Sequence, residues 1–469
     1  MTSESATTRQ HAIDLATEHV DSGAFLADLT RRVAVRTDST DPDNPALGEY
    51  LCTEIAPAVE ALGATTRIVP AGDGGGHPAL LASLEEDPAL PTVLVYGHAD
   101  VQPGLEGRWS EGLDPWRLEV RGDRWYGRGT ADNKGQHGAN LAALAAVRQA
   151  RGGRLGFNLR LLVETAEEVG SPGLRELAAA HRDELTADVL IASDGPRAAT
   201  DAPTVFLGSR GVVMLTLTAE RDGSHHSGNW GGLLRNPATE LVNALATLVD
   251  GRGRLLVDAL RPPPVPDAVR ELLADVTVGE GGPDNPQVDD AWGEPGLSRA
   301  ERLLAWNTLE VLAMTAGTPE SPVGAVPASA VAHLQLRFVV GTDWRSAADA
   351  LRAHLDAHGF ENVRVDVGGQ VPATRTDPTS PWVTWVRESL RRTTSRQPVL
   401  LPNLGGTLPN DVFADVLGMP TLWVPHSHPG CRQHAPDEHL LAGIAREAVQ
   451  LMAGVFWDLG EPGTPARTR

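Results

Sequence analysis

The sequence predicts an α/β protein: a main domain built on a mostly parallel sheet with helices on both faces, plus an inserted smaller α+β domain. Three observations support this prediction. Short, largely apolar segments alternate with helical segments in the first part of the chain, which is the pattern of a parallel sheet buried on both faces. Segments near residues 212 and 332 instead alternate apolar and polar residues, as strands with one exposed face do. Near residue 421 the first pattern returns.

The elements of the main domain follow from these patterns in order. Helical periodicity runs from about residue 11 to residue 35, with a break at 21–23. A second helical segment occupies 137–150. The apolar segments predicted to be strands are 92–96, 159–163, 187–192 and 421–424.

The inserted domain has a different texture. Residues 212–218 and 332–339 alternate as half-buried strands do, and residues 238–248 and 346–358 have helical periodicity. We therefore expect two strands and two helices in an inserted domain of residues 212–369. The main domain would then consist of residues 1–211 and 370–469.

Composition limits the classes of partner. The chain has 469 residues, of which 41% are hydrophobic and 22% charged, as in ordinary globular proteins. A formal net charge of −21 would repel nucleic acid and anionic lipid. No apolar segment approaches the roughly 18 residues of a membrane helix, and two cysteines are too few for a disulfide framework. We expect a cytoplasmic protein that binds neither nucleic acid nor membranes.

Side chains that can bind metal follow the predicted strands. In open α/β sheets, ligands bind beyond the carboxyl ends of the strands, so separate segments can deliver side chains to one place. The residues concerned are His98 and Asp100, then Glu164, Glu167 and Glu168, then Asp194, then His426, His428 and His434.

Each of these residues also has an ordinary interpretation. His98 and Asp100 lie on the same side of an extended segment, so the carboxylate could orient a metal-bound imidazole, but such pairs are usually only solvated. Asp132 could bridge two cations or cap the helix that follows it. Glu167 and Glu168 could divide between a metal ligand and a proton acceptor, or open a helix as a solvated pair.

The only lysine of the chain, Lys134, lies in the glycine-flanked segment 127–135 together with Asp132. An ammonium retained where every other cationic side chain is arginine indicates that this segment has a chemical role, although chance is the alternative.

Five segments match, in order, the motifs of a known family. The segments are 96–103, 125–135, 164–171, 193–195 and 433–438. They resemble the di-zinc metallopeptidases that include carnosine dipeptidase, aminoacylase, acetylornithine deacetylase and succinyl-diaminopimelate desuccinylase. The resemblance extends from about residue 25 to residue 454, and it is strongest to the dipeptidase-like branch.

This resemblance implies a role for each matched residue. It implies two Zn2+ per subunit, with Mn2+ or Co2+ as substitutes, and an inserted domain that serves as lid and dimerisation domain. The metal ligands would be a bridging Asp132, His98 and Asp194 on one ion, and Glu168 and His434 on the other; Asp100 would support His98, and Glu167 would be the general base.

The resemblance also implies substrate contacts. His226 matches a histidine that reaches the active site of a neighbouring subunit and stabilises the oxyanion, which implies a homodimer. Arg337 resembles an arginine that grips a substrate carboxylate, although it could be a surface residue of the sheet. Gly406 and Thr407 lie in a segment, 404–409, that resembles a loop close to the substrate backbone.

Three departures from the family pattern stand out. Asn133 replaces a usual aspartate, and Asn403 stands where dipeptidases often have a basic residue. Segment 425–432 holds His426, His428 and Cys431 where relatives often have acidic residues. For these histidines we weigh packing in the pocket wall against metal ligation, and for Cys431 a packed thiol against a reactive one.

The function implied is metal-dependent cleavage of a peptide bond in dipeptides or similar small amino-acid conjugates. A metal-bridging water would attack, and Glu167 would take its proton. The alternatives are an N-acyl amino-acid deacylase and a catalytically silent metal-binding relative. The retained Glu167 argues against the silent relative.

Overall fold

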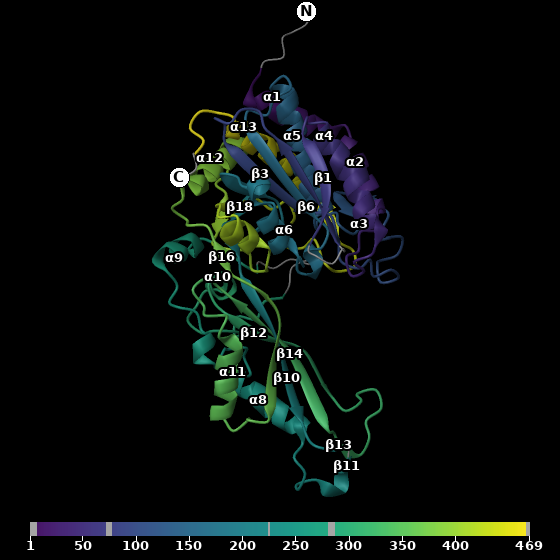
Figure 1. Cartoon of the computed structure of the whole chain (residues 1–469), viewed down its shortest axis with the longest axis vertical. Helices are drawn as coiled ribbons and strands as arrows, with labels where there is room; N and C mark the ends of the chain where they lie inside the picture. Colours follow the sequence, from purple (N-terminus) through teal and green to yellow (C-terminus); the bar gives the residue numbers. More distant parts are fainter. Residues whose placement is uncertain (1–6, 72–76, 224–225, 280–286, 466–469) are drawn as a thin grey trace, which may run out of the picture.

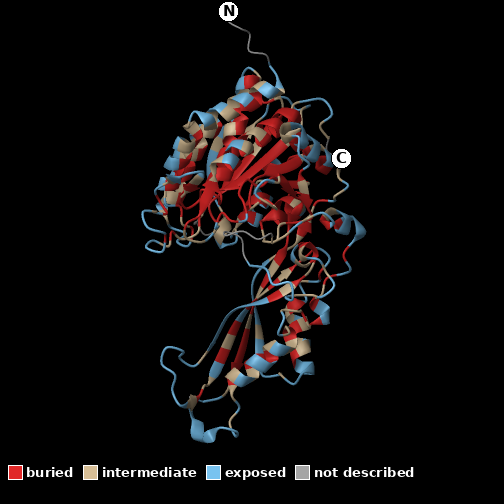
Figure 2. Cartoon of the chain, turned by 180° about the vertical axis from the view of Figure 1, so that it is seen from behind, coloured by how far each residue is buried: buried red, intermediate tan, exposed pale blue. Residues whose placement is uncertain are grey.

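The structure is a computed structural model that describes residues 7–71, 77–223, 226–279 and 287–465. Figure 1 shows a larger body, in which helices surround a sheet, and a narrower extension built on a second sheet. Buried residues are concentrated in the sheet of the larger body, while the far end of the extension is exposed (Figure 2). The predicted fold class is confirmed.

The main sheet has eight strands and is mostly parallel. β3 pairs in parallel with β6 and β7, β18 with β7, and β17 with β8. β1 and β2 form an antiparallel edge next to β6. In spatial order the strands are β1 (Thr65–Pro70), β2 (Pro78–Leu84), β6 (Asn158–Glu164), β3 (Thr92–His98), β7 (Val189–Ala192), β18 (Thr421–Trp423), β8 (Thr204–Phe206) and β17 (Val399–Leu401).

Helices cover both faces of this sheet because its strands are apolar on both sides. Val93 joins the core on one face and Leu94 the core on the other. The first face is covered by α1 (Arg9–Asp21), α2 (Ala24–Ala34), α5 (Lys134–Ala150), α12 (Pro381–Thr394) and α13 (Ala442–Leu459). The second is covered by α6 (Leu174–Ala180), α9 (Asp267–Leu273) and α10 (Arg299–Leu304). The predicted break between the first two helices is confirmed at Gly23, whose φ is 83°.

The extension is an antiparallel sheet with helices on one face. Its strands, in spatial order, are β12 (Thr308–Ala316), β14 (Ser329–Phe338), β10 (Gly211–Glu220) and β15 (Val363–Val371), and its helices are α8 (Pro237–Leu248) and α11 (Ala347–Ala357). The prediction of two strands was therefore wrong. The two additional strands lie at the edges of the sheet, and most of their side chains are exposed, so burial imposes a weaker pattern on them.

The limits of the inserted domain, 212–369, stay a prediction. The extension occupies nearly that range, from Gly211 of β10 to Val371 of β15, but α9 and α10 fall inside the range and pack into the core of the larger body. The remaining short elements are α3 (Pro45–Tyr50), α4 (Ala56–Glu60), α7 (Arg182–Leu185), β4 (Glu119–Arg121), β5 (Arg124–Tyr126), β9 (Gly208–Ser209), β11 (His226–Ser227), β13 (Ala325–Val326), β16 (Thr374–Arg375) and β19 (His439–Leu441). Among the described residues, no helix is both long and apolar enough to span a membrane.

The chain passes between the two sheets at β9 and β16, which pair with each other. Their close approach requires glycine. A Cβ atom added to Gly208 would lie 2.0 Å from the carbonyl oxygen of Thr374, and one added to Gly211 would lie 2.1 Å from the ring of Phe338.

We expect Gly208→Ala to destabilise the protein by about 1–3 kcal/mol, because the added methyl group overlaps backbone atoms that cannot rotate away. Chemical denaturation measures this loss. Gly251→Ala is the matched control, since a Cβ atom there meets nothing within 4 Å. Equal stability of the two variants would contradict the prediction.

Candidate metal centre

Five of the predicted residues converge at the carboxyl ends of the main strands. His98 ends β3, Asp194 follows β7, and Glu168 lies in the short turn after β6. Asp132 precedes α5, and His434 lies between β18 and β19. Five distant segments therefore supply side chains to one edge of the sheet, as the strand pattern predicts for a parallel sheet.

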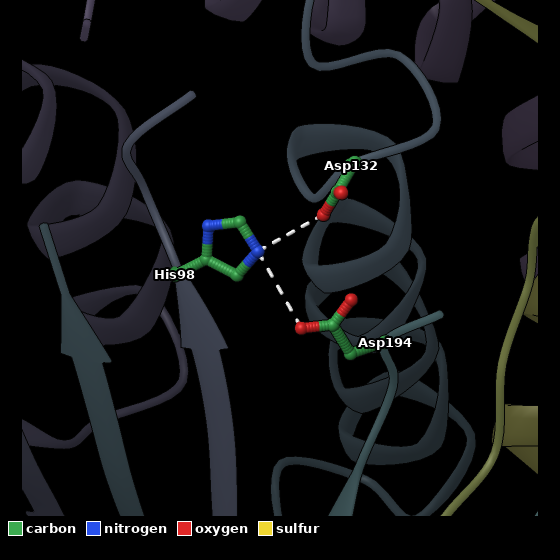
Figure 3. A group of neighbouring side chains, drawn as sticks. All are labelled: His98, Asp132 and Asp194. Carbon is green, nitrogen blue, oxygen red and sulfur yellow. Dashed lines mark hydrogen bonds and ion pairs between the residues drawn. The ribbon is translucent and has the colours of Figure 1, made fainter. Parts of the chain in front are cut away.

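The side chains of the first group are buried. Nε2 of His98 lies 3.1 Å from Oδ1 of Asp132 and 3.4 Å from Oδ2 of Asp194 (Figure 3). The potential ligand atoms of these three residues all lie within 4.8 Å of one another.

The second group shares Asp132 with the first. Nε2 of His434 lies 2.9 Å from Oδ2 of Asp132 and 3.1 Å from Oε2 of Glu168. These ligand atoms also lie within 4.8 Å of one another. The two oxygens of one carboxylate therefore face two histidines, which is the arrangement that a bridge between two cations needs.

Asp100 supports both groups. Its carboxylate accepts hydrogen bonds from the backbone N–H groups of Glu167 and Glu168, at 3.2 and 3.0 Å. Its backbone oxygen lies 3.1 Å from Nδ1 of His98, and its carboxylate lies 3.4 Å from the same atom. The second ring nitrogen of His98 is thus held in place, as it is in typical metal sites.

The charges at the site affect one another strongly. Burial opposes protonation of His98 and His434, but hydrogen bonds to the surrounding carboxylates raise the pKa of His98 well above its usual range and that of His434 to about 11. Burial raises the pKa of Glu168 to about 7. Two imidazoles and three carboxylates form a mixed nitrogen and oxygen donor set, which fits zinc.

Glu167 belongs to neither group of potential ligands. Burial, together with the charges of Asp194 and Glu168, raises its pKa well above the ordinary value, although His98 acts in the opposite direction. A carboxylate beside the ligands, with a raised affinity for protons, is suited to act as a general base.

The other predicted residues are placed in two regions. Nη1 of Arg337, on β14, donates to Oγ1 of Thr407 at 2.7 Å, and the backbone oxygens of Leu404 and Gly406 both accept from the N–H of Arg210. The structure therefore joins the candidate substrate residues Arg337, Gly406 and Thr407 into one region.

His226 is exposed on β11, at the far end of the extension from the metal groups of its own chain (Figure 1). Its neighbours Ser224 and His225 lie outside the described residues.

The residues of segment 425–432 are packed inside the protein. His426 and His428 are buried and belong to neither of the two ligand groups found among the described residues. Cys431 is also buried, and burial raises the pKa of its thiol to about 12, which agrees with a packed thiol.

Asn133 donates to the backbone oxygen of Ser193 at 2.9 Å, a bond that an ionised aspartate could not make. Asn403 is buried.

Lys134 has an anchoring position. Its Nζ donates to the backbone oxygens of Arg32 and Val35, at 2.9 and 2.7 Å. An ammonium at this position compensates the partial negative charge of the carbonyl groups at the end of α2. Its segment is thus tied to the first helices.

Two further residues support the site. Gln102 donates to Oε2 of Glu168 at 3.0 Å. Continuing the alternation of His98 and Asp100 by one step would have identified it. Glu438 accepts hydrogen bonds from three backbone N–H groups of the segment that carries Asp132, and only the folded chain shows this contact.

Fold and site together define an α/β protein with a candidate metal centre of the hydrolase type. The chain belongs to Peptidase family M20/M25/M40, whose model matches residues 94–458. The family resemblance inferred from the motifs is thereby confirmed.

Relatives were found among curated proteins. The chain is 34% identical over 285 residues to the Beta-Ala-His dipeptidase of Mus musculus, covering 58% of this chain and 54% of that protein. It is 29% identical over 371 residues to the Cysteinylglycine-S-conjugate dipeptidase of Corynebacterium striatum, covering 77% and 75%. The chain spans about half the length of the mouse, rat and human dipeptidases that it matches.

Solved structures share the fold. The M20 family metallo-carboxypeptidase Sso-CP2 from Sulfolobus solfataricus has a TM-score of 0.80 at 25% identity, covering 93% of this chain and 99% of that one. The di-peptidase Dug1p from Saccharomyces cerevisiae has a TM-score of 0.82 at 22% identity, covering 96% and 99%.

Glu164 leads to a prediction about pH. It is buried and accepts hydrogen bonds from the hydroxyls of Tyr96 and Ser171, at 2.7 and 2.9 Å. Burial, and then the charge of Asp100, raises its pKa from 4.5 to about 7. Because the folded protein holds this proton more tightly than the unfolded chain, the associated stability is complete below pH 4.5 and is lost as the pH rises through 7.

We therefore expect Glu164→Gln to gain stability relative to the unsubstituted protein between pH 5 and pH 8, by up to roughly 3 kcal/mol. The amide resembles a carboxyl group that stays neutral. Thermal unfolding of both metal-free proteins across this range measures the difference. Parallel stability curves would refute the assignment of a raised pKa to Glu164.

Proposed function

We propose that this protein is a metal-dependent dipeptidase that uses two divalent cations, with zinc as the first choice and Mn2+ or Co2+ as substitutes. The observation that supports this most directly is the shared carboxylate of Asp132, whose two oxygens face His98 and His434 at 3.1 and 2.9 Å. Membership of a peptidase family and similarity to two kinds of dipeptidase agree with it.

In this proposal each group has a defined task. His98 and Asp194 would hold one cation, Glu168 and His434 would hold the other, and Asp132 would serve both. When bound, the cations supply Lewis acidity that polarises the scissile carbonyl and makes water more acidic. Glu167 accepts the proton of the attacking water and passes it to the leaving amine.

The substrate would be held from the extension. Arg337 lies on β14 and donates through Nε to Gln335 and through Nη1 to Thr407, so two anchors fix its orientation. A guanidinium held in this way suits a substrate carboxylate. Gly406 would allow the substrate backbone to approach closely.

We also propose a cytoplasmic homodimer assembled through the extension. His226 would stabilise the oxyanion in the site of the partner subunit, since it lies far from the metal groups of its own chain (Figure 1). β12 is an edge strand that exposes Val311, Leu312 and Met314 by 47%, 53% and 42%. Such an edge favours pairing with a second copy.

A substrate panel tests the proposal. The zinc-loaded protein is assayed with dipeptides and with N-acyl amino acids that have matched carboxyl-terminal residues. Faster cleavage of the dipeptides supports the proposal. Preferential cleavage of the N-acyl compounds would identify a deacylase, and metal binding without any cleavage would identify a silent relative.

Glu167→Gln should keep its fold and its metal but lose roughly 10²- to 10⁴-fold in turnover, because the variant lacks the proton acceptor. Glu168→Gln should instead bind metal more weakly, because it lacks a ligand. Metal content and turnover of both variants are compared. Equal metal loss in the two would show that their roles are assigned wrongly.

Mixing His226→Ala and Glu167→Gln proteins should restore activity, although each alone is inactive. A mixed dimer has one site with an intact Glu167 and a His226 from the other chain. Subunit exchange is verified with two different affinity tags, and activity is measured on the doubly purified fraction. Verified mixed dimers as inactive as the parents would exclude action across subunits.

A further inference from the structure

Glu438 is neither a proposed metal ligand nor a proposed catalytic or substrate-binding residue, yet its carboxylate has an extensive set of hydrogen-bond partners. It lies four positions after His434 and is fully buried. Its Oε1 accepts from the backbone N–H groups of Gly129, Ala131 and Asp132, each at 3.0 Å. Three donors from one short segment therefore converge on a single oxygen.

The second oxygen has an equally specific partner. Oε2 of Glu438 accepts from Nη1 of Arg128 at 2.7 Å, and both side chains are buried. Nη2 of Arg128 donates to the backbone oxygen of Pro103 at 3.0 Å, and the backbone oxygen of Glu438 accepts from Gly127. These partners of the carboxylate are all donors, and each of its oxygens accepts at least one hydrogen bond.

Only an ionised carboxylate satisfies these donors on both sides. A glutamine would direct its NH2 group either at the three backbone N–H groups or at Arg128, so one side would place donors against a donor. The unpaired charge of Arg128 would then remain buried, which is strongly unfavourable.

We propose that Glu438 is a positioning residue for the bridging carboxylate of Asp132, with Arg128 as its counter-ion. Glu438 fixes the backbone of Asp132 and lies in the same loop region as His434, so one buried carboxylate links the segments that carry two ligands. This inference rests on the proposed metal centre and extends it to a residue outside both ligand groups.

Asp132 belongs to both ligand groups, and this determines the effect that we expect from a change at Glu438. Because Asp132 contacts both histidines, loosening its backbone should weaken both metal sites together. We expect Glu438→Gln to lower zinc affinity at both sites by roughly 10- to 100-fold, as loss of an outer-shell partner typically does. Loss of a ligand such as Glu168 should mainly affect one site.

The experiment combines calorimetric zinc titration with amide hydrogen exchange on the metal-free protein. In Glu438→Gln, exchange should accelerate at Gly129, Ala131 and Asp132. The double variant Arg128→Met/Glu438→Gln should recover much of the affinity, because the amide oxygen can then face the three N–H groups. This double variant also keeps the test decisive if the single variant folds poorly.

Asp458→Asn is the matched control. Asp458 is also a buried carboxylate, and it pairs with Arg9 and Arg392. Its loss should lower stability without changing zinc affinity or exchange in the segment 129–132.

The outcomes separate this inference from the proposed function. Unchanged zinc affinity and unchanged local exchange in Glu438→Gln would overturn the positioning role while leaving the metal centre intact. Absence of zinc binding in the unsubstituted protein would refute the metal centre, and the inference with it.

Discussion

The carboxylate of Asp132 lies between two imidazoles, and the rest of the site is arranged around this contact. Burial alone would keep such a carboxyl group protonated, but hydrogen bonds from His434 and His98 hold its pKa below the ordinary value. The two histidine segments therefore favour the charged form of a carboxyl group that burial disfavours. The metal centre that we propose depends on that charge.

The fold meets this requirement by bringing rigid strand ends together. β3 and β7 are neighbours in the sheet, so His98 and Asp194 are placed side by side by backbone pairing. Asp132 and His434 lie on longer connections and are fixed by buried side chains, including Lys134 and Glu438. The site thus combines ligands whose positions are determined by strand pairing with ligands whose positions are determined by side-chain packing. The positions of the second kind depend on a larger number of residues.

The elements that could be predicted best from the sequence are those whose residue pattern is imposed by burial. Strands buried on both faces leave continuous apolar segments, and polar residues at their ends, such as His98 and Asp194, stand out against them. Edge strands carry a weaker signal, because most side chains of β12 and β15 are exposed. In β15 only a short alternation of Val363, Val365 and Val367 with Arg364 and Asp366 remains. Contacts between distant segments, such as Arg337 with Thr407 and Glu438 with the segment of Asp132, leave no periodic pattern and become visible only in the folded chain.

Lys134 has one more consequence, which concerns the chemistry of the molecular surface. It is the only lysine of the chain, and it is fully buried. The folded chain therefore keeps this amine out of reach of acylating reagents, crosslinkers and lysine-specific proteases. Modification or cleavage at Lys134 would occur only when the segment beside the metal centre opens. The chain thus carries a single natural reporter of local unfolding, located next to the residues on which its proposed activity depends.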